Sequence, residues 1–204
     1  MPPTEPPLTA PANVPCIRPV TVVSGLPRSG TSLAMQMLVA GGMDPMVDGQ
    51  RIADADNPRG YLEFEKVKQL AIDSTWVAGA VGKAVKVIHL LVPLLPTDIE
   101  YRVLFMERDL GEVTRSQSAM LQRSGRGGAS LSADALAKVY SQQLAAVHAH
   151  MDAHACFKVL RVPYAQLVSA PSDWARSINA HVGGHLDETA MAAAVDPALY
   201  RNRT

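Results

Sequence analysis

The sequence has few cysteines, no net charge and no long hydrophobic run. Its two cysteines, Cys16 and Cys156, are too few for a disulfide framework, so we expect reduced thiols in a cytoplasmic protein. Lys plus Arg and Asp plus Glu number 19 each, and this balance argues against a nucleic-acid partner. No apolar run reaches the ~18 residues that a membrane span requires. The neutral charge balance is still compatible with a local basic cluster around a small anionic ligand.

The first 19 residues are rich in proline and poor in large apolar side chains. They hold seven of the fifteen prolines, which predicts a disordered or loosely attached tail over residues 1–19. No basic region followed by an apolar one occurs at the N-terminus, so no secretory signal is predicted. Apolar residues make up 48% of the chain, enough to bury a core. We therefore predict a single domain over residues 20–204.

Four short apolar runs have the character of buried parallel strands. They are residues 20–24, 84–90, 102–106 and 157–162. Their apolar character is nearly continuous, as expected when helices cover both faces of a sheet. Helical patterns cover residues 31–40 and 133–151, and a glycine- and serine-rich linker at 123–134 predicts a mobile loop. Strands that alternate with helices predict a three-layer α/β/α fold with a mostly parallel central sheet.

The stretch "VTVVSGLPRSGTSL" at residues 20–33 has the layout of a phosphate-binding loop but lacks its lysine. Gly25 and Gly30 satisfy the G-x-x-x-x-G spacing between a strand and a helix. Thr31 then stands where an ATP- or GTP-binding loop carries lysine, while Ser32 keeps the hydroxyl position. The usual partner of a triphosphate is therefore missing.

Arg28 provides the positive charge that remains in this loop. Its planar guanidinium suits a tetrahedral oxyanion, and the backbone amides from Ser29 to Ser32 can point at the same group. The positive N-terminal end of the following helix adds to this field. The loop is therefore predicted to hold an anionic ligand without a γ-phosphate; the alternative is a tight turn with no ligand.

At this point the chain resembles a known family. The string "PRSGTS" after a strand is similar to the 5′-phosphosulfate loop of sulfotransferases, in the arginine form of tyrosylprotein and many bacterial members. The segment "FMERDLGEVTRSQSAML" carries Arg108 and Ser116 eight residues apart, the separation of the family's 3′-phosphate-binding pair. The segment "RVPYAQLVSAP" resembles one whose tyrosine contacts the adenine, which puts Tyr164 against the base. "DNPRGYLEFEKV" resembles a stretch of bacterial sulfotransferase-like sequences.

The resemblance covers roughly residues 20–204 and implies a P-loop NTPase-like fold. It implies 3′-phosphoadenosine-5′-phosphosulfate (PAPS) as the donor, with 3′,5′-adenosine bisphosphate (PAP) as the product. Two departures stand out: the glycine-aspartate-tryptophan-lysine segment of cytosolic members is absent, and the chain is too short for their acceptor-binding inserts. Arg201 and Arg203 either substitute for the missing segment or form a frayed basic tail.

Sulfuryl transfer requires cations for the developing charge and a base for the acceptor's proton, but no metal. Arg28 and Lys86 are the predicted catalytic cations. Lys86 lies in the apolar run "AVKVIHL", where an ammonium is costly unless it reaches a site. The family places a catalytic lysine on the corresponding strand, which supports Lys86. A solvent-exposed lysine on an edge strand is the alternative.

The base has two candidates. His89 follows Lys86 by three residues, whereas cytosolic sulfotransferases separate their lysine and histidine by two. Because strand side chains alternate, this spacing turns His89 away from Lys86 unless the strand ends first. Tyrosylprotein sulfotransferases instead use a glutamate after the first helix, and Glu63, which follows "NPRGY", is favoured here. Other acidic candidates in this region are Asp54, Asp56 and Glu65. A core histidine and a helix-capping glutamate are the structural alternatives.

Three functions fit the sequence: a sulfotransferase, a protein that binds PAP or PAPS without turnover, and a P-loop phosphotransferase that uses a nucleoside triphosphate. The missing lysine and the Arg108–Ser116 pair favour the first over the third. His150 and His154 lie at i,i+4 with His148 nearby, but without a fixed third ligand a polar helix face is favoured over a metal site. The sequence predicts neither the acceptor nor the oligomeric state.

Overall fold

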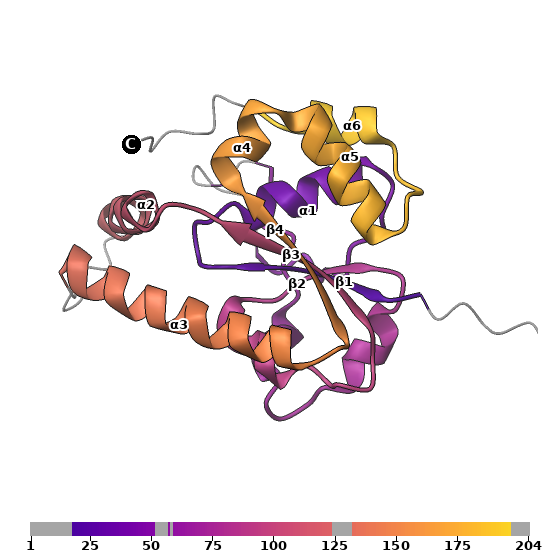
Figure 1. Ribbon diagram of the computed structural model, residues 1–204, viewed down its shortest axis with the longest axis horizontal. Helices are drawn as coiled ribbons and strands as arrows, with labels where there is room; N and C mark the ends of the chain where they lie inside the picture. The colour runs from indigo at the N-terminus through magenta and orange to yellow at the C-terminus, as the bar shows by residue number, and fades with distance from the viewer. Residues whose placement is uncertain (1–17, 52–56, 58, 124–131, 197–204) are drawn as a thin grey trace, which may run out of the picture.

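A sheet of four parallel strands forms the centre of the protein (Figure 1). The computed structural model describes residues 18–51, 57, 59–123 and 132–196. The strands follow the order β2-β1-β3-β4 across the sheet. They are β1 (Val20–Gly25), β2 (Ala84–Lys86), β3 (Tyr101–Glu107) and β4 (Phe157–Pro163). Helices flank the sheet, so the predicted three-layer α/β/α fold is confirmed.

Two helical layers cover the two faces of the sheet (Figure 1). One face packs against α1 (Thr31–Ala40), α4 (Tyr164–Ser169), α5 (Pro171–Val182) and α6 (Glu188–Ala193). The other packs against α3 (Ala133–Ala153) and three short 3₁₀ helices, η1 (Glu65–Gln69), η2 (Thr75–Ala80) and η3 (His89–Leu94). Strand side chains alternate between these layers: Val23 and Leu104 face α1, whereas Val22 and Val103 face α3.

The strand predicted at residues 84–90 is too long. Only Ala84–Lys86 pair with β1, although the Val87 N–H still donates to the Val23 carbonyl at 3.0 Å. The chain then turns into η3, which contains Pro93, a residue without the N–H that a strand ladder needs. The first part of this apolar run therefore forms a strand, and its last residues begin a half-buried 3₁₀ helix.

The first helix has the predicted bounds, and four of its ten residues are buried against the sheet. Met35, Met37 and Leu38 have no exposed surface, and burial of each contributes about 1.5–3 kcal/mol. The helix stops at Gly41, whose N–H donates to the Met37 carbonyl at 2.9 Å. Because these side chains pack α1 against the sheet, the backbone amides of its first turn have a fixed direction.

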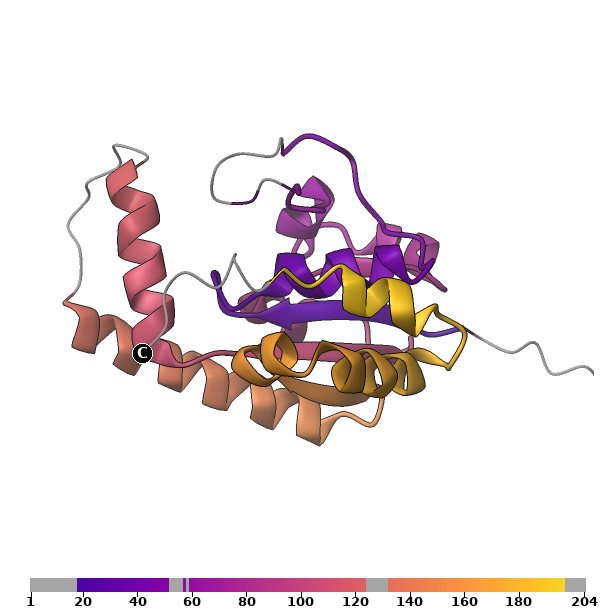
Figure 2. The ribbon, with the colours of Figure 1, turned by 90° about the horizontal axis from the view of Figure 1, so that it is seen from above.

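Helix α2 (Leu110–Arg123) projects beyond the carboxyl ends of the strands and packs against the N-terminal part of α3 (Figure 2). The predicted helix at 133–151 is confirmed, and its Val147 and Met151 are buried against the sheet. The proline-rich tail, apart from residues 18 and 19, and the central part of the linker lie outside the described residues. Within the described ranges no helix combines the length and apolarity needed to cross a membrane.

Candidate functional site

A pocket of about 470 Å³ lies at the carboxyl edge of the sheet. The strand order places β2 and β3 on opposite sides of β1, so the connections after β1 and β3 diverge at this edge. Such a switch point opens the crevice in which α/β sheets bind ligands. The loop after β1, the segment after β2, Arg108 just after β3, and helix α2 all line the pocket.

The two phosphate-loop glycines occupy positions where the backbone conformation and the neighbouring atoms leave no space for a side chain. Gly25 has φ 146° and Gly30 has φ 103°, values that favour glycine. A Cβ on Gly25 would lie 2.6 Å from Ser29 Oγ and 2.7 Å from the Met106 carbonyl oxygen. A Cβ on Gly30 would lie 2.4 Å from the ring of Tyr164. The loop is thus pressed against β3 and against the tyrosine predicted to contact adenine.

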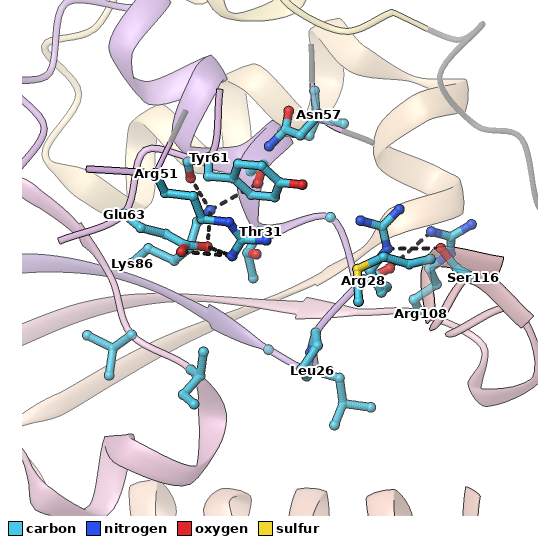
Figure 3. A pocket seen from close by; sticks show the side chains of 18 of the residues that line it. Leu26, Arg28, Thr31, Arg51, Asn57, Tyr61, Glu63, Lys86, Arg108 and Ser116 are labelled. Carbon is cyan, nitrogen blue, oxygen red and sulfur yellow. Dashed lines mark hydrogen bonds and ion pairs between the residues drawn. The ribbon is translucent and has the colours of Figure 1, made fainter. Parts of the chain in front are cut away.

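Arg28 joins the loop to helix α2. Its backbone is in the left-handed region at φ 70°, which is strained for a residue with a side chain. Its Nε donates to Ser116 Oγ at 3.1 Å, and its carbonyl accepts a hydrogen bond from Arg108 at 3.0 Å. The loop arginine and the predicted 3′-phosphate pair therefore form one connected group (Figure 3).

The loop amides divide into two kinds. The Ser29 N–H donates to the Leu26 carbonyl at 3.1 Å, so this amide closes a turn and does not join the predicted anion-binding set. Intrahelical bonding begins at Ala34, whose N–H donates to the Gly30 carbonyl at 3.2 Å. The amides of residues 31–33 precede it in the first turn of α1, where a helix offers them no acceptor.

Lys86 reaches the start of α1 from the neighbouring strand. Although β2 is an edge strand, the residue is only 6% exposed. Its Nζ donates to Ser32 Oγ at 2.9 Å and to the Tyr61 carbonyl, and it lies 3.7 Å from a carboxylate oxygen of Glu63. Burial lowers the pKa of Lys86 to about 8, and the charge of Glu63 opposes that shift. The solvent-exposed alternative for this lysine is wrong.

Glu63 lies beside Lys86 and is held by an arginine that the sequence did not single out. Arg51 donates to both carboxylate oxygens of Glu63, at 3.0 and 2.9 Å. The Arg51 guanidinium also sits 3.5 Å from the centroid of the Tyr61 ring. Figure 3 shows these three side chains with Lys86 on one side of Thr31. Tyr61 stands in the "NPRGY" stretch, but no sequence pattern points to Arg51.

His89 does not join the other predicted residues. It is 2% exposed, and its Nε2 lies 2.9 Å from Gln143 Oε1 on α3. It does not line the pocket. The strand ends at Lys86, and the histidine turns to the α3 face of the sheet while the lysine faces α1. This position is consistent with the side-chain alternation that counted against His89.

Arg108 is held by a buried carboxylate. Its Nε donates to Glu112 Oε2 at 2.8 Å, and the two side chains are 8% and 4% exposed. Its guanidinium lies 4.6 Å from the centroid of the Tyr164 ring, a cation–π distance. The Glu112 N–H in turn donates to Asp109 Oδ1 at 3.0 Å. The sequence did not single out Glu112, although its place four residues after Arg108 on a helix is a recognisable pairing distance.

Of the remaining candidates that the structure describes, Glu65 lines the pocket and accepts a hydrogen bond from Lys68 at 2.6 Å, whereas the histidines of α3 do not line it. The rings of His150 and His154 stack at 4.2 Å, and His154 Nδ1 bonds to the His150 carbonyl. Over the described part of the chain, no group of three or more His, Cys, Asp or Glu side chains is arranged to hold a metal ion. Asp54, Asp56, Arg201 and Arg203 lie outside the described residues.

A scan against models of known protein families finds no match to this chain, and a search of curated proteins finds none either. The resemblance to sulfotransferases therefore stays a prediction from four short motifs. Three cations line one pocket: Arg28 and Arg108, which follow the neighbouring strands β1 and β3, and Lys86 of β2. The glycine loop and the N-terminus of α1 line the same pocket.

Proposed function

We propose that this protein is a sulfotransferase that moves a sulfuryl group from PAPS to a hydroxyl or amine acceptor. The observation that carries the proposal is the direct connection between two anion-binding elements. Arg28, after β1, donates to Ser116 on α2, and Arg108, at the end of β3, donates to the Arg28 carbonyl. PAPS carries anionic groups at the 5′ and 3′ positions of one ribose. The linked arginines Arg28 and Arg108 match these two groups.

The residues present fit such a donor. The loop leaves no room for a side chain on Gly25 or Gly30, as expected where backbone wraps an anion. Ser29 Oγ is buried and has no hydrogen-bond partner among the described residues. In this proposal the loop from Arg28 to Ser32 holds the 5′-phosphosulfate, Arg108 and Ser116 hold the 3′-phosphate, and Tyr164 packs on the adenine. The bound donor supplies the sulfuryl group.

Lys86 takes the place of the absent loop lysine. Its ammonium meets Ser32 at the first turn of α1, and there it stabilises negative charge that develops on the transferred group. Arg28 provides the second cation. A pKa near 8 leaves Lys86 mostly protonated at neutral pH, as this role requires.

Glu63 is the better placed of the two predicted bases. It lines the pocket next to Lys86, whereas His89 is bonded to Gln143 outside it. Arg51 donates one hydrogen bond to each carboxylate oxygen of Glu63, and each oxygen keeps a second lone pair with which it can accept the proton of an incoming acceptor. General base catalysis of this kind contributes about 10²–10⁴-fold to a rate.

The first test is calorimetric titration with PAP, AMP and Mg-ATP. PAP is expected to bind at least tenfold more tightly than AMP, which is about 1.4 kcal/mol, because only PAP meets the Arg108–Ser116 pair. Release of PAP from PAPS in the presence of acceptors then measures turnover. Preference for Mg-ATP supports a phosphotransferase instead. PAP binding without any turnover supports a nucleotide-binding protein.

A further inference from the structure

Lys86 is a buried amine beside a carboxylate, and the proposed sulfuryl transfer uses only its protonated form. Its Nζ lies 3.7 Å from Glu63 Oε1 (Figure 3). Burial lowers the pKa of Lys86 to about 8; the charge of Glu63 opposes the shift and the charge of Arg51 adds to it. A lysine that is desolvated beside a second cation is the kind that attacks carbonyl groups, because more of it is unprotonated. The unprotonated amine is therefore a nucleophile without an assigned role.

An anion-binding turn lies next to this amine. The Nζ of Lys86 is 2.9 Å from Ser32 Oγ, in the first turn of α1, where the amides of residues 31–33 have no acceptor within the helix. Such amides bind phosphate groups. In the loop before the helix, Ser29 is 1% exposed, and its Oγ has no hydrogen-bond partner among the described residues. A buried hydroxyl without a partner is costly unless a ligand supplies one.

The separation between the amine and this turn restricts the ligand. A carbonyl carbon bonded to Lys86 Nζ and a phosphate held by the amides of residues 31–33 would be only a few bonds apart, because the Nζ already contacts the same turn. One small molecule that carries both an aldehyde and a phosphate ester meets this requirement. The pocket of about 470 Å³, which Lys86 lines, has room for it.

The surroundings of Lys86 also suit imine formation. Glu63 lines the pocket, and each of its carboxylate oxygens keeps a lone pair beyond the hydrogen bond from Arg51. Glu63 can therefore take a proton from the nitrogen of Lys86 and return it to an oxygen. Because Lys86 is only 6% exposed, little water reaches the imine to hydrolyse it.

We propose that Lys86 is a covalent modification site for phosphorylated aldehydes, whose phosphate is held by the loop after β1 and the first turn of α1. The nitrogen of Lys86 forms a bond to the carbonyl carbon, the carbonyl π electron pair moves to oxygen, and Glu63 carries one proton from nitrogen to that oxygen. The carbon–oxygen bond of the carbinolamine then breaks. The oxygen leaves as water with the second proton of the nitrogen, and an imine remains.

The inference goes beyond the proposed function, because it requires only a phosphate-binding loop beside a nucleophilic lysine. An adduct on Lys86 places its phosphate in the loop that holds the 5′-phosphosulfate in the proposed function. It therefore blocks any donor that uses this loop. Since imine formation is reversible, the level of the aldehyde sets the fraction of protein that is blocked.

The test traps the imine with borohydride and maps the modified lysines by peptide mass spectrometry. It is run at pH 8, near the pKa of Lys86. The probes are pyridoxal 5′-phosphate and glyceraldehyde 3-phosphate, each beside its phosphate-free counterpart, 5-deoxypyridoxal and glyceraldehyde. Lys68 is the internal reference, because it lines the same pocket but its side chain is 66% exposed and bound to Glu65. The ratio of Lys86 to Lys68 modification cancels differences in aldehyde reactivity.

This ratio is expected to be at least tenfold higher for a phosphorylated probe than for its counterpart. An effect in one pair only assigns the source, a planar cofactor or a sugar phosphate. Lys86→Arg keeps the cation but cannot form an imine, so it should abolish the phosphate-dependent modification. Lys68→Arg is the matched control and should leave Lys86 modification within twofold of wild type. Circular dichroism checks the fold of both variants, and the wild-type peptide map needs neither.

The inference is overturned if both pairs give equal ratios, or if Lys68 is modified in preference to Lys86. PAP titration tests the proposed function separately. If Lys86 is modified but PAP does not bind, the proposed function fails and the inference stands. If PAP binds but no phosphorylated probe modifies Lys86, the inference fails and the proposed function stands.

Discussion

The ammonium of Lys86 lies 2.9 Å from Ser32 Oγ at the start of α1, although the lysine belongs to β2. A phosphate loop normally carries its own lysine one residue after the second glycine, where this chain has Thr31. Moving the lysine's charge to a neighbouring strand leaves the short side chain of Thr31 after the second glycine. It also ties the charge to a buried position, where it is costly unless an anion is close.

Lys86→Met is expected to weaken PAP binding at least tenfold, because it removes the cation at the first turn of α1. In wild-type protein, PAP affinity is expected to fall as the pH rises through about 8, where the free lysine loses its proton. The variant should show no such fall. Calorimetric titrations between pH 7 and 9.5 measure both effects. Lys66→Met, at an exposed lysine outside the pocket lining, is the control and should behave as wild type.

The same shift affects folding. The folded-state pKa of Lys86 is about 8, below its ordinary value of 10.5, so between these values the unfolded chain binds more protons than the folded one. The contribution of Lys86 to stability is therefore expected to rise with pH from about 8 to 10.5. Urea unfolding of wild type and Lys86→Met across this range should give a difference that moves in favour of wild type. If the difference in unfolding free energy between wild type and Lys86→Met stays constant with pH, the pKa of Lys86 is not lowered in the folded protein.

Glu63→Gln and His89→Gln separate the two candidate bases. Glu63→Gln is expected to lower the turnover number by about 10²-fold or more while PAP affinity stays within threefold, since the amide keeps the shape but cannot take a proton. His89→Gln should retain turnover and lose about 1 kcal/mol of unfolding free energy, because His89 bonds to Gln143 in the core. The opposite pattern, with turnover lost only at His89, would contradict the assignment of Glu63.

The phosphate-loop pattern led to Arg28, and the resemblance to sulfotransferases led to Arg108, Ser116 and Tyr164; all four line one pocket. Each stands just after a strand or on the helix that follows, where topology brings functional groups together. Arg51 could not be found in this way, because it belongs to no described helix or strand whose periodicity would relate it to Glu63. Residues without periodicity carry no signal for their partners.

The loop and helix α1 depend on a glycine at position 30. Gly30→Ala is expected to lower the unfolding free energy by about 2–4 kcal/mol, since the methyl group meets the Tyr164 ring and the backbone has positive φ. Gly42→Ala is the control for φ alone: Gly42 has φ 97°, and a methyl group added there would meet nothing within 4 Å. Urea unfolding measures both, and equal losses would show that contact with Tyr164 adds nothing.

The predicted strand at 84–90 shows that a short apolar run does not distinguish a strand from a 3₁₀ helix. A short apolar run fits a buried strand and a half-buried 3₁₀ helix equally well, because neither imposes a distinct period over so few residues. Pro93 lies just beyond the run, too late to mark where the strand ends. The longer helices at Thr31–Ala40 and Ala133–Ala153 were predictable because their patterns extend over several turns.

The pocket is lined by residues of β1, α1, β2, α2 and the start of α4 and by Arg108 just after β3, so a ligand there links segments from most of the described chain. PAP at 100 times its dissociation constant should stabilise the fold by about 2.7 kcal/mol, which corresponds to roughly 5–11 °C in Tm for a domain of this size. At the same concentration AMP should give a smaller rise, because it lacks the 3′-phosphate.

Arg108→Gln is expected to bring the Tm rise with PAP down to that with AMP, since the guanidinium beside Tyr164 and the Arg28 carbonyl is the proposed 3′-phosphate ligand. Arg161→Gln is the matched control: this arginine on β4 lies 3.9 Å from Glu107 and does not line the pocket. Thermal unfolding followed by circular dichroism measures all four ligand–variant combinations. If Arg108→Gln keeps the full difference between PAP and AMP, the 3′-phosphate is not bound at the end of β3, and the donor must lie differently across the switch point.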